Sequence, residues 1–422
     1  MITLTEAEQI ATGWAHRQSI RRGYVCTPFV EELTLGYAVS MLLPPEVRTE
    51  PGADVTTVID RETGRLSHWP PAPATELDRR YTERRDTAVG SHRTSDPVAE
   101  LRREAYRRVS PSVAAHLTLG GRLFQARGAK GDQELRHHRI VAALLAAVPP
   151  EDTARGAERH AELLVVSDVL QEADRTRAAS GLDPLTLGEA RTLLGQGRIE
   201  TFHIRESGDP YGGRPATFCA TCADVLLDLT VIGDADRAHP KIGRPSPGLD
   251  HEPGRFPDEV AWALAADGWG PSTGEKRERD GLRAVERIER SPGGEFTLEA
   301  FPAARAAFAE FYDTGLSING PGVAQRVRWF QLGSGGLYHL ADPLHELGAL
   351  VGARMFPLGR EGFDEAIVAI DEHGRVFSLD QGGEWFVGET LDEAIVALAT
   401  GLPAARIHDD GTWTAPAEGG RR

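Results

Sequence analysis

Cysteine is scarce in this chain, with three residues among 422. So few cysteines exclude a small scaffold held by disulfides and fit a reducing compartment, so we expect a cytoplasmic protein. Two of the three, Cys219 and Cys222, lie three residues apart. Chance gives that spacing about once in fifty such sequences, so the pair indicates a shared role such as metal binding. Only Cys26 is then left without an assignment.

Long apolar runs are also absent. No stretch approaches the ~20 apolar residues that a membrane-spanning helix requires. Met1 is not followed by the basic and then apolar run of a secretory signal. We therefore expect neither a span nor a signal peptide. The length predicts about two to four domains, and an apolar content of 40% is ordinary for globular ones.

An excess of basic residues is missing as well, since the formal net charge is −16. Residues 1–100 carry 11 basic and 15 acidic groups, residues 101–250 carry 20 of each, and residues 256–401 carry 12 and 24. This uneven distribution indicates separate modules and does not suit one continuous nucleic-acid-binding surface. The acidic last third suits a cationic partner, although acidity also keeps a domain soluble.

What the chain does have is a pair of short motifs, His160-Ala161-Glu162 and Cys219-Ala220-Thr221-Cys222. The first is weak alone, because 14 histidines and 63 acids make such triplets common. Together they supply one His, two Cys and one Glu, which is the residue set of a zinc nucleobase deaminase. The alternatives are a structural zinc, or a chance cysteine pair with an unrelated surface glutamate.

Helix geometry sets a condition on these motifs. Residues two apart on a helix point in nearly opposite directions, so His160 and Glu162 can share a site only where they open a helix. Cys219 and Cys222 are three apart and face the same way at the start of another helix. We expect two helix N-termini to converge on one ion, where their dipoles favour thiolates.

Three protein ligands leave zinc with an open fourth position, which is typical of a catalytic site. Glu162 would then move protons from water to the ring nitrogen and the leaving ammonia of a cytosine-like or adenine-like ring. Because residues 101–250 have no basic excess, we expect a nucleoside, a nucleotide or a short single strand as substrate. A local arginine cluster would weaken this argument: Arg102, Arg103, Arg107, Arg108, Arg136 and Arg139.

The first 75 residues predict a small α+β domain with a helix over residues 5–18 and four strands. The strands are expected at residues 25–30, 35–42, 55–60 and 66–69. The Leu35-Gly36-Tyr37 strand and the hairpin from Val58 to Gly64 resemble the YrhB-like immunity domain, and a generic α+β module is the alternative. Residues 76–110 read as a charged helical connector.

Residues 111–236 predict a hairpin about Gly120-Gly121, a helix over 135–148, the His160 helix, a helix over 187–194, a strand over 199–206 and the Cys219 helix. This order resembles the YwqJ-like deaminases of bacterial toxin systems over about residues 110–235. The resemblance implies a cytidine-deaminase-like α/β/α domain in which His160, Cys219 and Cys222 bind zinc and Glu162 is the catalytic proton shuttle.

Two features depart from that pattern. Phe218 stands where many deaminases have proline, and a long segment separates the two motifs. Three further histidines lie nearby. We expect His137 and His138 at the surface or in a substrate loop, and His203 as a packed or surface residue rather than a fourth ligand.

Residues 237–255 are a proline-rich linker, and residues 256–402 predict a second α+β domain followed by a tail at 403–422. Several stretches resemble the third subtype of the SUKH immunity domains: Phe256-Pro257-Asp258-Glu259, Gly268-Trp269-Gly270-Pro271, Met355-Phe356-Pro357-Leu358 and the Asp371 to Arg375 turn. The resemblance implies a toxin-binding surface and no catalysis.

These patterns together predict an α/β and α+β multidomain protein of a bacterial toxin–immunity system, with a zinc deaminase between immunity-type domains. One alternative is a non-catalytic immunity protein whose deaminase-like part is a binding scaffold. Another is a salvage enzyme for free nucleosides.

Overall fold

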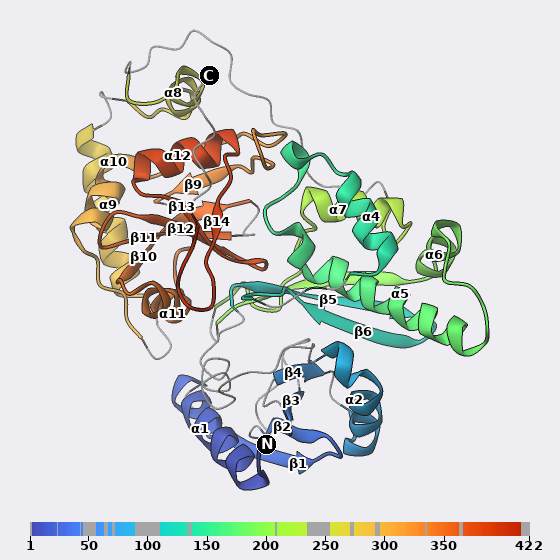
Figure 1. The fold of residues 1–422 in the computed structure, drawn as a ribbon. Coiled ribbons are helices and arrows are strands. Elements are labelled where there is room, and N and C mark those ends of the chain that lie inside the picture. Colours follow the sequence, from blue (N-terminus) through green and yellow to red (C-terminus); the bar gives the residue numbers. More distant parts are fainter. Residues whose placement is uncertain are drawn as a thin grey trace. The chain divides into compact units, whose positions relative to one another are not determined.

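A computed structural model describes residues 2–22, 24–42, 44, 56–62, 66–69, 72–88, 110–132, 135, 137–206, 209–233, 254–270, 274–291, 296–333, 336–362 and 366–414. The chain forms two compact units, Met1–Arg108 and Val109–Arg422. The described residues form three separate sheets, so the fold is mixed α/β with several domains, as predicted (Figure 1). No helix in the described ranges is long and apolar enough to cross a membrane.

In its described residues, the first unit is an antiparallel sheet with two helices. The sheet has the order β1-β2-β3-β4, and α1 packs on β1 and β2. Ala7 and Ala11 of α1 are buried against Tyr37 and Ile59, as the helical spacing predicts. Trp14 follows Ala7 and Ala11 at helical spacing in the sequence, and its side chain lies outside the described residues. The elements are α1 (Leu4–Arg22), β1 (Thr27–Glu32), β2 (Gly36–Leu42), β3 (Thr56–Asp60), β4 (Leu66–Trp69) and α2 (Ala74–Ala88).

The first part of the second unit is built on a three-stranded antiparallel sheet. Strand β5 is central and pairs with β6 and β7, and α5 packs on β5 and β6. The predicted Gly120-Gly121 turn is present, with positive φ at both glycines. The elements are β5 (Ser112–Leu119), β6 (Arg122–Arg127), α4 (Arg139–Ala147), α5 (Ala161–Ala179), α6 (Leu187–Leu194), β7 (Arg198–Ile204) and α7 (Ala220–Asp228).

Helix starts in this part are fixed by local chemistry. Thr186 and Glu189 form a reciprocal capping box at α6, which lies within the long segment between the two motifs. His138 caps α4 through Nδ1 and is buried, with its Nε2 2.8 Å from Asp174. The surface position expected for His138 is therefore wrong, because its ring is used to cap a buried helix start.

The second part of the unit is a seven-stranded antiparallel sheet with the order β14-β13-β12-β11-β10-β9-β8. Helix α10 packs on β10 and β11, α11 on β10 and α12 on β13 (Figure 1). The elements are α8 (Asp258–Ala266), α9 (Gly274–Glu289), α10 (Pro302–Phe311), β8 (Thr314–Leu316), β9 (Phe330–Leu332), α11 (Ala341–Val351), β10 (Met355–Glu361), β11 (Ala366–Asp371), β12 (Val376–Asp380), β13 (Gly383–Gly388), α12 (Leu391–Thr400) and β14 (Ala405–Arg406).

The predicted Asp371 to Arg375 turn joins β11 to β12. The chain beyond residue 402 differs from the expectation of a tail, because β14 pairs with β13. Trp413 stacks on Phe386 with 5.1 Å between ring centroids. Trp413 lies in no helix or strand, so no periodic pattern in the sequence could predict its packing against Phe386.

The second unit has two hydrophobic cores. One is formed by residues between Val113 and Val231, the other by residues between Phe256 and Ile407. The two core clusters share no residue. Ion pairs join the two parts, among them Arg155–Glu361, Lys130–Glu384 and Asp132–Arg406. Most of the predicted proline-rich linker between them lies outside the described residues.

Candidate metal and active site

His160 and Glu162 open a helix, as their spacing requires. Gly156 has a φ of 66° and leads into a single 3-10 turn over Ala157–Arg159, after which His160 is the extended N-cap residue of α5. Glu162 falls in the first turn of α5. Both side chains are buried, at 2% and 0% exposure.

The two cysteines open a second helix. Cys219 is the N-cap of α7, and its Sγ accepts the Cys222 backbone N–H at 3.4 Å. Between them, Thr221 Oγ1 accepts the Ala154 N–H at 2.8 Å and donates to the Asp152 carbonyl at 3.2 Å. This contact ties the start of α7 to the loop that leads into His160, so the two helix starts are held together.

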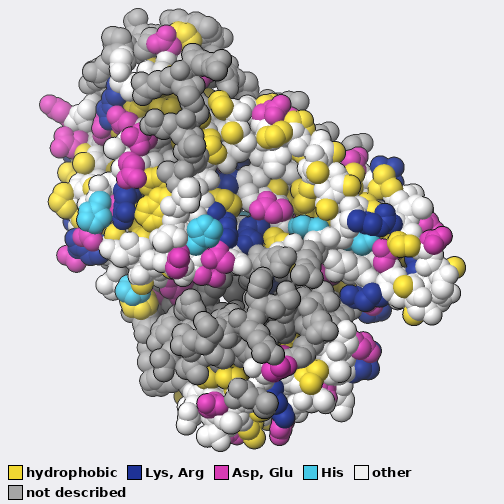
Figure 2. All heavy atoms as spheres, in the orientation of Figure 1, with side chains coloured by type: hydrophobic (Ala, Val, Ile, Leu, Met, Phe, Trp, Pro, Cys, Tyr) yellow, Lys and Arg dark blue, Asp and Glu magenta, His cyan; other side chains and the backbone are white. Residues whose placement is uncertain are grey.

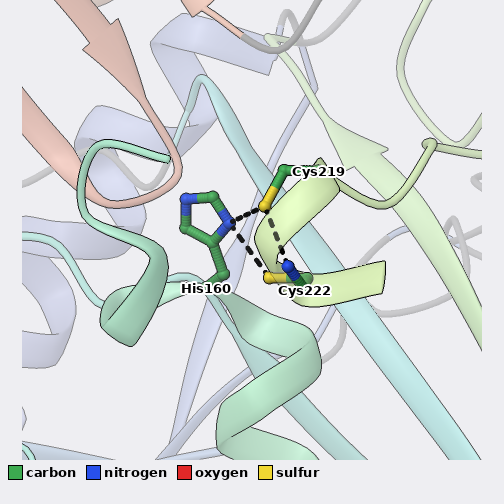
Figure 3. A group of neighbouring side chains, drawn as sticks. All are labelled: His160, Cys219 and Cys222. Atoms are coloured by element: carbon green, nitrogen blue, oxygen red, sulfur yellow. Dashed lines mark hydrogen bonds between the residues drawn. The ribbon is translucent and has the colours of Figure 1, made fainter. Parts of the chain in front are cut away.

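The three candidate ligand atoms converge (Figure 3). His160 Nδ1 lies 3.4 Å from the Sγ of Cys219 and 3.4 Å from the Sγ of Cys222. Zinc bonds of about 2.0 Å to nitrogen and 2.3 Å to sulfur at tetrahedral angles would separate the two atoms by about 3.5 Å. The described residues therefore fit a zinc ion on these ligands, and they form a possible metal site.

The electrostatics of the group also favour a cation. The Cys222 amide and thiol, together with His160, hold the pKa of Cys219 well below its usual range against the opposing effect of burial. Burial lowers the pKa of His160, but Cys219 and Glu162 outweigh it and raise that pKa to about 9. Thiolate and carboxylate charges thus favour positive charge in this buried site, and a metal ion on these ligands would supply it.

Glu162 has the properties of a proton carrier. Burial raises its pKa to about 7, in spite of the opposing effect of His160. Neither of its carboxylate oxygens has a hydrogen-bond partner of good geometry among the described residues, although the Gln381 side chain is close enough to lower the pKa. A buried carboxyl group whose pKa lies near neutrality can both accept and return a proton.

Sequence reasoning missed Gln381, which lies in the turn between β12 and β13. Its side-chain Oε1 accepts the Ala161 backbone N–H at 3.1 Å, and both groups are buried. The neighbouring Asp380 contributes to raising the pKa of His160. Gln381 follows Ala161 by 220 positions, so no local pattern could place it there.

The other residues considered from the sequence lie apart from the metal group. His203 is buried on β7 and is not among the three residues that converge, which agrees with its expected packing role. His137 Nε2 contacts the Glu158 carbonyl at 2.6 Å. Phe218 stands where many deaminases have proline, and its side chain packs against the core of this part. An apolar contact therefore anchors the residue before Cys219.

Comparison with known families agrees with this arrangement. The model of the YwqJ-like deaminases matches residues 100–231. The chain carries a YwqJ-like deaminase domain. The model of the SUKH-3 immunity protein matches residues 256–401, and that of the immunity protein 35-like domain matches residues 5–88. The three families expected from the residues are thus confirmed, with the N-terminal match given as immunity protein 35-like. No curated protein and no solved structure gives a significant match.

The family and the geometry agree on one point. The matched deaminase region contains the His160, Cys219 and Cys222 group, which is typical of a zinc deaminase site. The SUKH-3 and immunity protein 35-like regions flank it in the sequence. Below, the deaminase domain means residues 110–233 and the SUKH-3 domain means residues 254–414.

Proposed function

We propose that the deaminase domain is a zinc-dependent deaminase with a cytidine-deaminase-like fold, followed by a SUKH-type α+β domain. It would hydrolyse the exocyclic C–N bond of a cytosine-like or adenine-like ring and release ammonia. The observation that supports this most is the burial of Glu162, which follows His160 by two residues at the start of α5, where His160 meets two convergent thiols. A structural zinc site does not require a completely buried carboxyl group of raised pKa beside its ligands.

Each residue then has a separate role. His160, Cys219 and Cys222 would hold the ion, and a bound zinc would supply a Lewis acid that makes water acidic enough to ionise near neutral pH. Glu162 would accept the proton of that water at its carboxylate. Glu162 would then return protons to the ring nitrogen and to the departing amino group, which leaves as ammonia while oxygen takes its place on carbon.

The substrate stays a prediction from charge. Figure 2 shows acidic and basic side chains interspersed over the visible face. Five of the six arginines that could form a cluster, Arg102, Arg103, Arg107, Arg108 and Arg136, lie outside the described residues, and Arg139 donates to the Leu185 carbonyl. The balance of 20 basic and 20 acidic groups in residues 101–250 supports a nucleoside, a nucleotide or a short single strand as substrate, because its base needs no extraction from a duplex.

The flanking domains suggest a bacterial toxin–immunity system. We propose that the acidic SUKH-3 domain binds a toxin-type partner, and that the protein acts in the cytoplasm. A non-catalytic immunity protein is the second candidate, because the observation that Glu162 is completely buried also suits a deaminase-like scaffold that admits no substrate. Zinc content and turnover separate the two.

Metal analysis tests the ligand set first. The purified chain should contain one zinc, and Cys219→Ser or Cys222→Ser should lower zinc occupancy at least about tenfold, because a hydroxyl is a far weaker zinc ligand than a thiolate. Inductively coupled plasma analysis after dialysis measures this. Cys26→Ser is the matched control, since Cys26 is buried in the other unit and should leave zinc unchanged. Full occupancy in the Cys219/Cys222 double variant would contradict the proposal.

A further inference from the structure

A turn of the SUKH-3 domain packs against the start of α5, beside the candidate metal site. The turn between β12 and β13 carries Asp380, Gln381 and Gly382, and the Gln381 carboxamide reaches the first turn of α5. The approach is tight on both sides. A Cβ added to Gly128 would come within 2.3 Å of the Gln381 carbonyl oxygen, and one added to Gly156 within 2.7 Å of the Trp385 ring.

The carboxamide makes contacts that a base would need. Its carbonyl oxygen accepts the Ala161 N–H, and its side chain lies beside Glu162, which must contact the ring nitrogen in the proposed reaction. A primary carboxamide carries an acceptor and an amino group on one carbon, as the amidine group of cytosine does with its ring nitrogen and exocyclic amino group. The Gln381 carboxamide thus resembles part of a nucleobase and lies next to Glu162, the proposed proton shuttle.

A buried ion-pair network holds the turn in place. Arg155 of the deaminase domain donates from Nη2 to Glu361 at 2.7 Å and to Ser378 at 2.8 Å, and lies 3.5 Å from Asp380. Arg328 pairs with the same Glu361 at 2.9 Å. The charges of Arg155 and Arg328 balance those of Glu361 and Asp380. Arg155 of the deaminase domain thus enters a buried site of the SUKH-3 domain whose charge is compensated.

Two more charged residues of the deaminase domain, Lys130 and Asp132, pair with groups of the SUKH-3 domain. Lys130 Nζ is 3.2 Å from Glu384, and Asp132 pairs with Arg406 and with His408, the latter at 2.9 Å. Both residues of the deaminase domain lie in one loop after β6. In one pair the deaminase domain supplies the cation, Lys130, and in the other it supplies the anion, Asp132. This alternation of charge fixes how the two surfaces align.

We propose that the SUKH-3 domain binds the deaminase domain of its own chain across the metal site, and that the Gln381 carboxamide occupies the place of the substrate base. The partner of this immunity-type surface is then the adjoining deaminase rather than only a foreign toxin. Substrate enters when the two domains separate. This inference rests on the proposed deaminase function where ammonia release is measured, whereas the rate at which a chelator removes zinc tests it independently of that function.

Charge reversal in the full chain tests the contact. The variant Lys130→Glu/Asp132→Arg places like charges against Glu384 and Arg406 and should separate the domains. Adding Glu384→Lys/Arg406→Asp restores opposite charges at both pairs. Arg290→Glu is the control for charge change alone, because Arg290 is exposed just after α9 and pairs only with Glu286 of that helix among the ion pairs of the described residues. Gln381→Ala removes the carboxamide and leaves the ion pairs in place.

Two readouts are measured on each zinc-loaded protein: the rate at which a chelator removes zinc, and the rate of ammonia release from cytidine, adenosine, their nucleotides and short single strands. The reversed variant should release zinc about tenfold faster or more, because juxtaposed like charges disfavour an interface strongly. The restored variant should return toward the parent rate, and Arg290→Glu should match the parent. Deamination should rise in the reversed variant and in Gln381→Ala.

The outcomes separate this inference from the proposed function. Faster zinc release without ammonia from any substrate would support the closed site and contradict the deaminase. Parent-like zinc release in both the reversed variant and Gln381→Ala would overturn the closed site, whatever the deaminase activity. Lower deamination in Gln381→Ala would also overturn it, because Gln381 would then assist the reaction. If the reversed variant does not fold, Gln381→Ala decides by the same two rates.

Discussion

At the scale of single residues, Glu162 combines complete burial with the lack of a hydrogen bond of good geometry among the described residues. A buried carboxyl group normally accepts hydrogen bonds, which lower its pKa and keep it charged. Glu162 has no hydrogen bond of good geometry from the described residues, and burial raises its pKa to about 7. The fold therefore bears a desolvation cost at this position, which is what a proton carrier near neutral pH requires.

Glu162→Gln tests this role directly. Zinc should stay at one per chain, because Glu162 is not among the three convergent ligands. Deamination should fall about a hundredfold to ten-thousandfold, since glutamine keeps the shape but cannot carry a proton. Steady-state ammonia release together with metal analysis measures both. Glu158→Gln is the matched control, as Glu158 is exposed in the turn just before His160. Parent-like turnover in Glu162→Gln would assign the proton transfer to another group.

At the scale of elements, the turn before α5 determines two things at once. Gly156 needs its left-handed backbone to lead into the 3-10 turn that sets the direction of His160. The same residue lies against Trp385 of the SUKH-3 domain. Ligand placement and domain contact therefore depend on a single glycine.

A pair of glycine substitutions separates these two effects. Gly181→Ala introduces a side chain at a φ of 70° with nothing within 4 Å, so it should cost about 1 kcal/mol of unfolding free energy through backbone strain alone. Gly156→Ala has a similar φ of 66° but meets Trp385, so the loss should be larger, about 2–3 kcal/mol. Denaturant unfolding measures the difference. Equal losses in the two variants would show that the Trp385 contact has no energetic weight.

At the scale of the whole second unit, ion pairs rather than a shared hydrophobic core join the deaminase and SUKH-3 domains. Burial alone would raise the pKa of Glu361, but Arg155 and Arg328 lower it below its ordinary value of 4.5. The same two arginines lower the pKa of Asp380 against the effect of burial. Lowered pKa values mean that the charged forms stabilise the folded contact.

Acid should therefore loosen this contact. The stabilisation from Glu361 is fully present above about pH 4.5, its ordinary value, and is lost as the pH falls through the lowered value. Thermal unfolding of the metal-free chain between pH 7 and pH 3 should show the unfolding temperature falling over that acid range. Glu361→Gln should be less stable at neutral pH and show a shallower fall. A profile equally steep in that variant would mean that Glu361 does not contribute.

Much of the site was predictable because its determinants are local. His160 and Glu162 had to open a helix since two-residue spacing permits no other shared site, and Cys219 and Cys222 had to share a helical turn. The Gly120-Gly121 turn and α6 followed from equally local rules. The position of His138 was mispredicted because a histidine that caps a buried helix has the same neighbours in sequence as an exposed one.

By itself, the sequence determined the families, the candidate ligand set and the elements that carry it, because spacing along a helix or strand fixes which side chains point together. Tertiary structure alone decided that Gln381 would meet Ala161 and that Arg155 would join Glu361 and Asp380. These groups lie more than 200 positions apart, and nothing in their neighbours records the approach. Contacts between separately packed cores depend on the surfaces that each core presents, and only the folded chain brings those surfaces together.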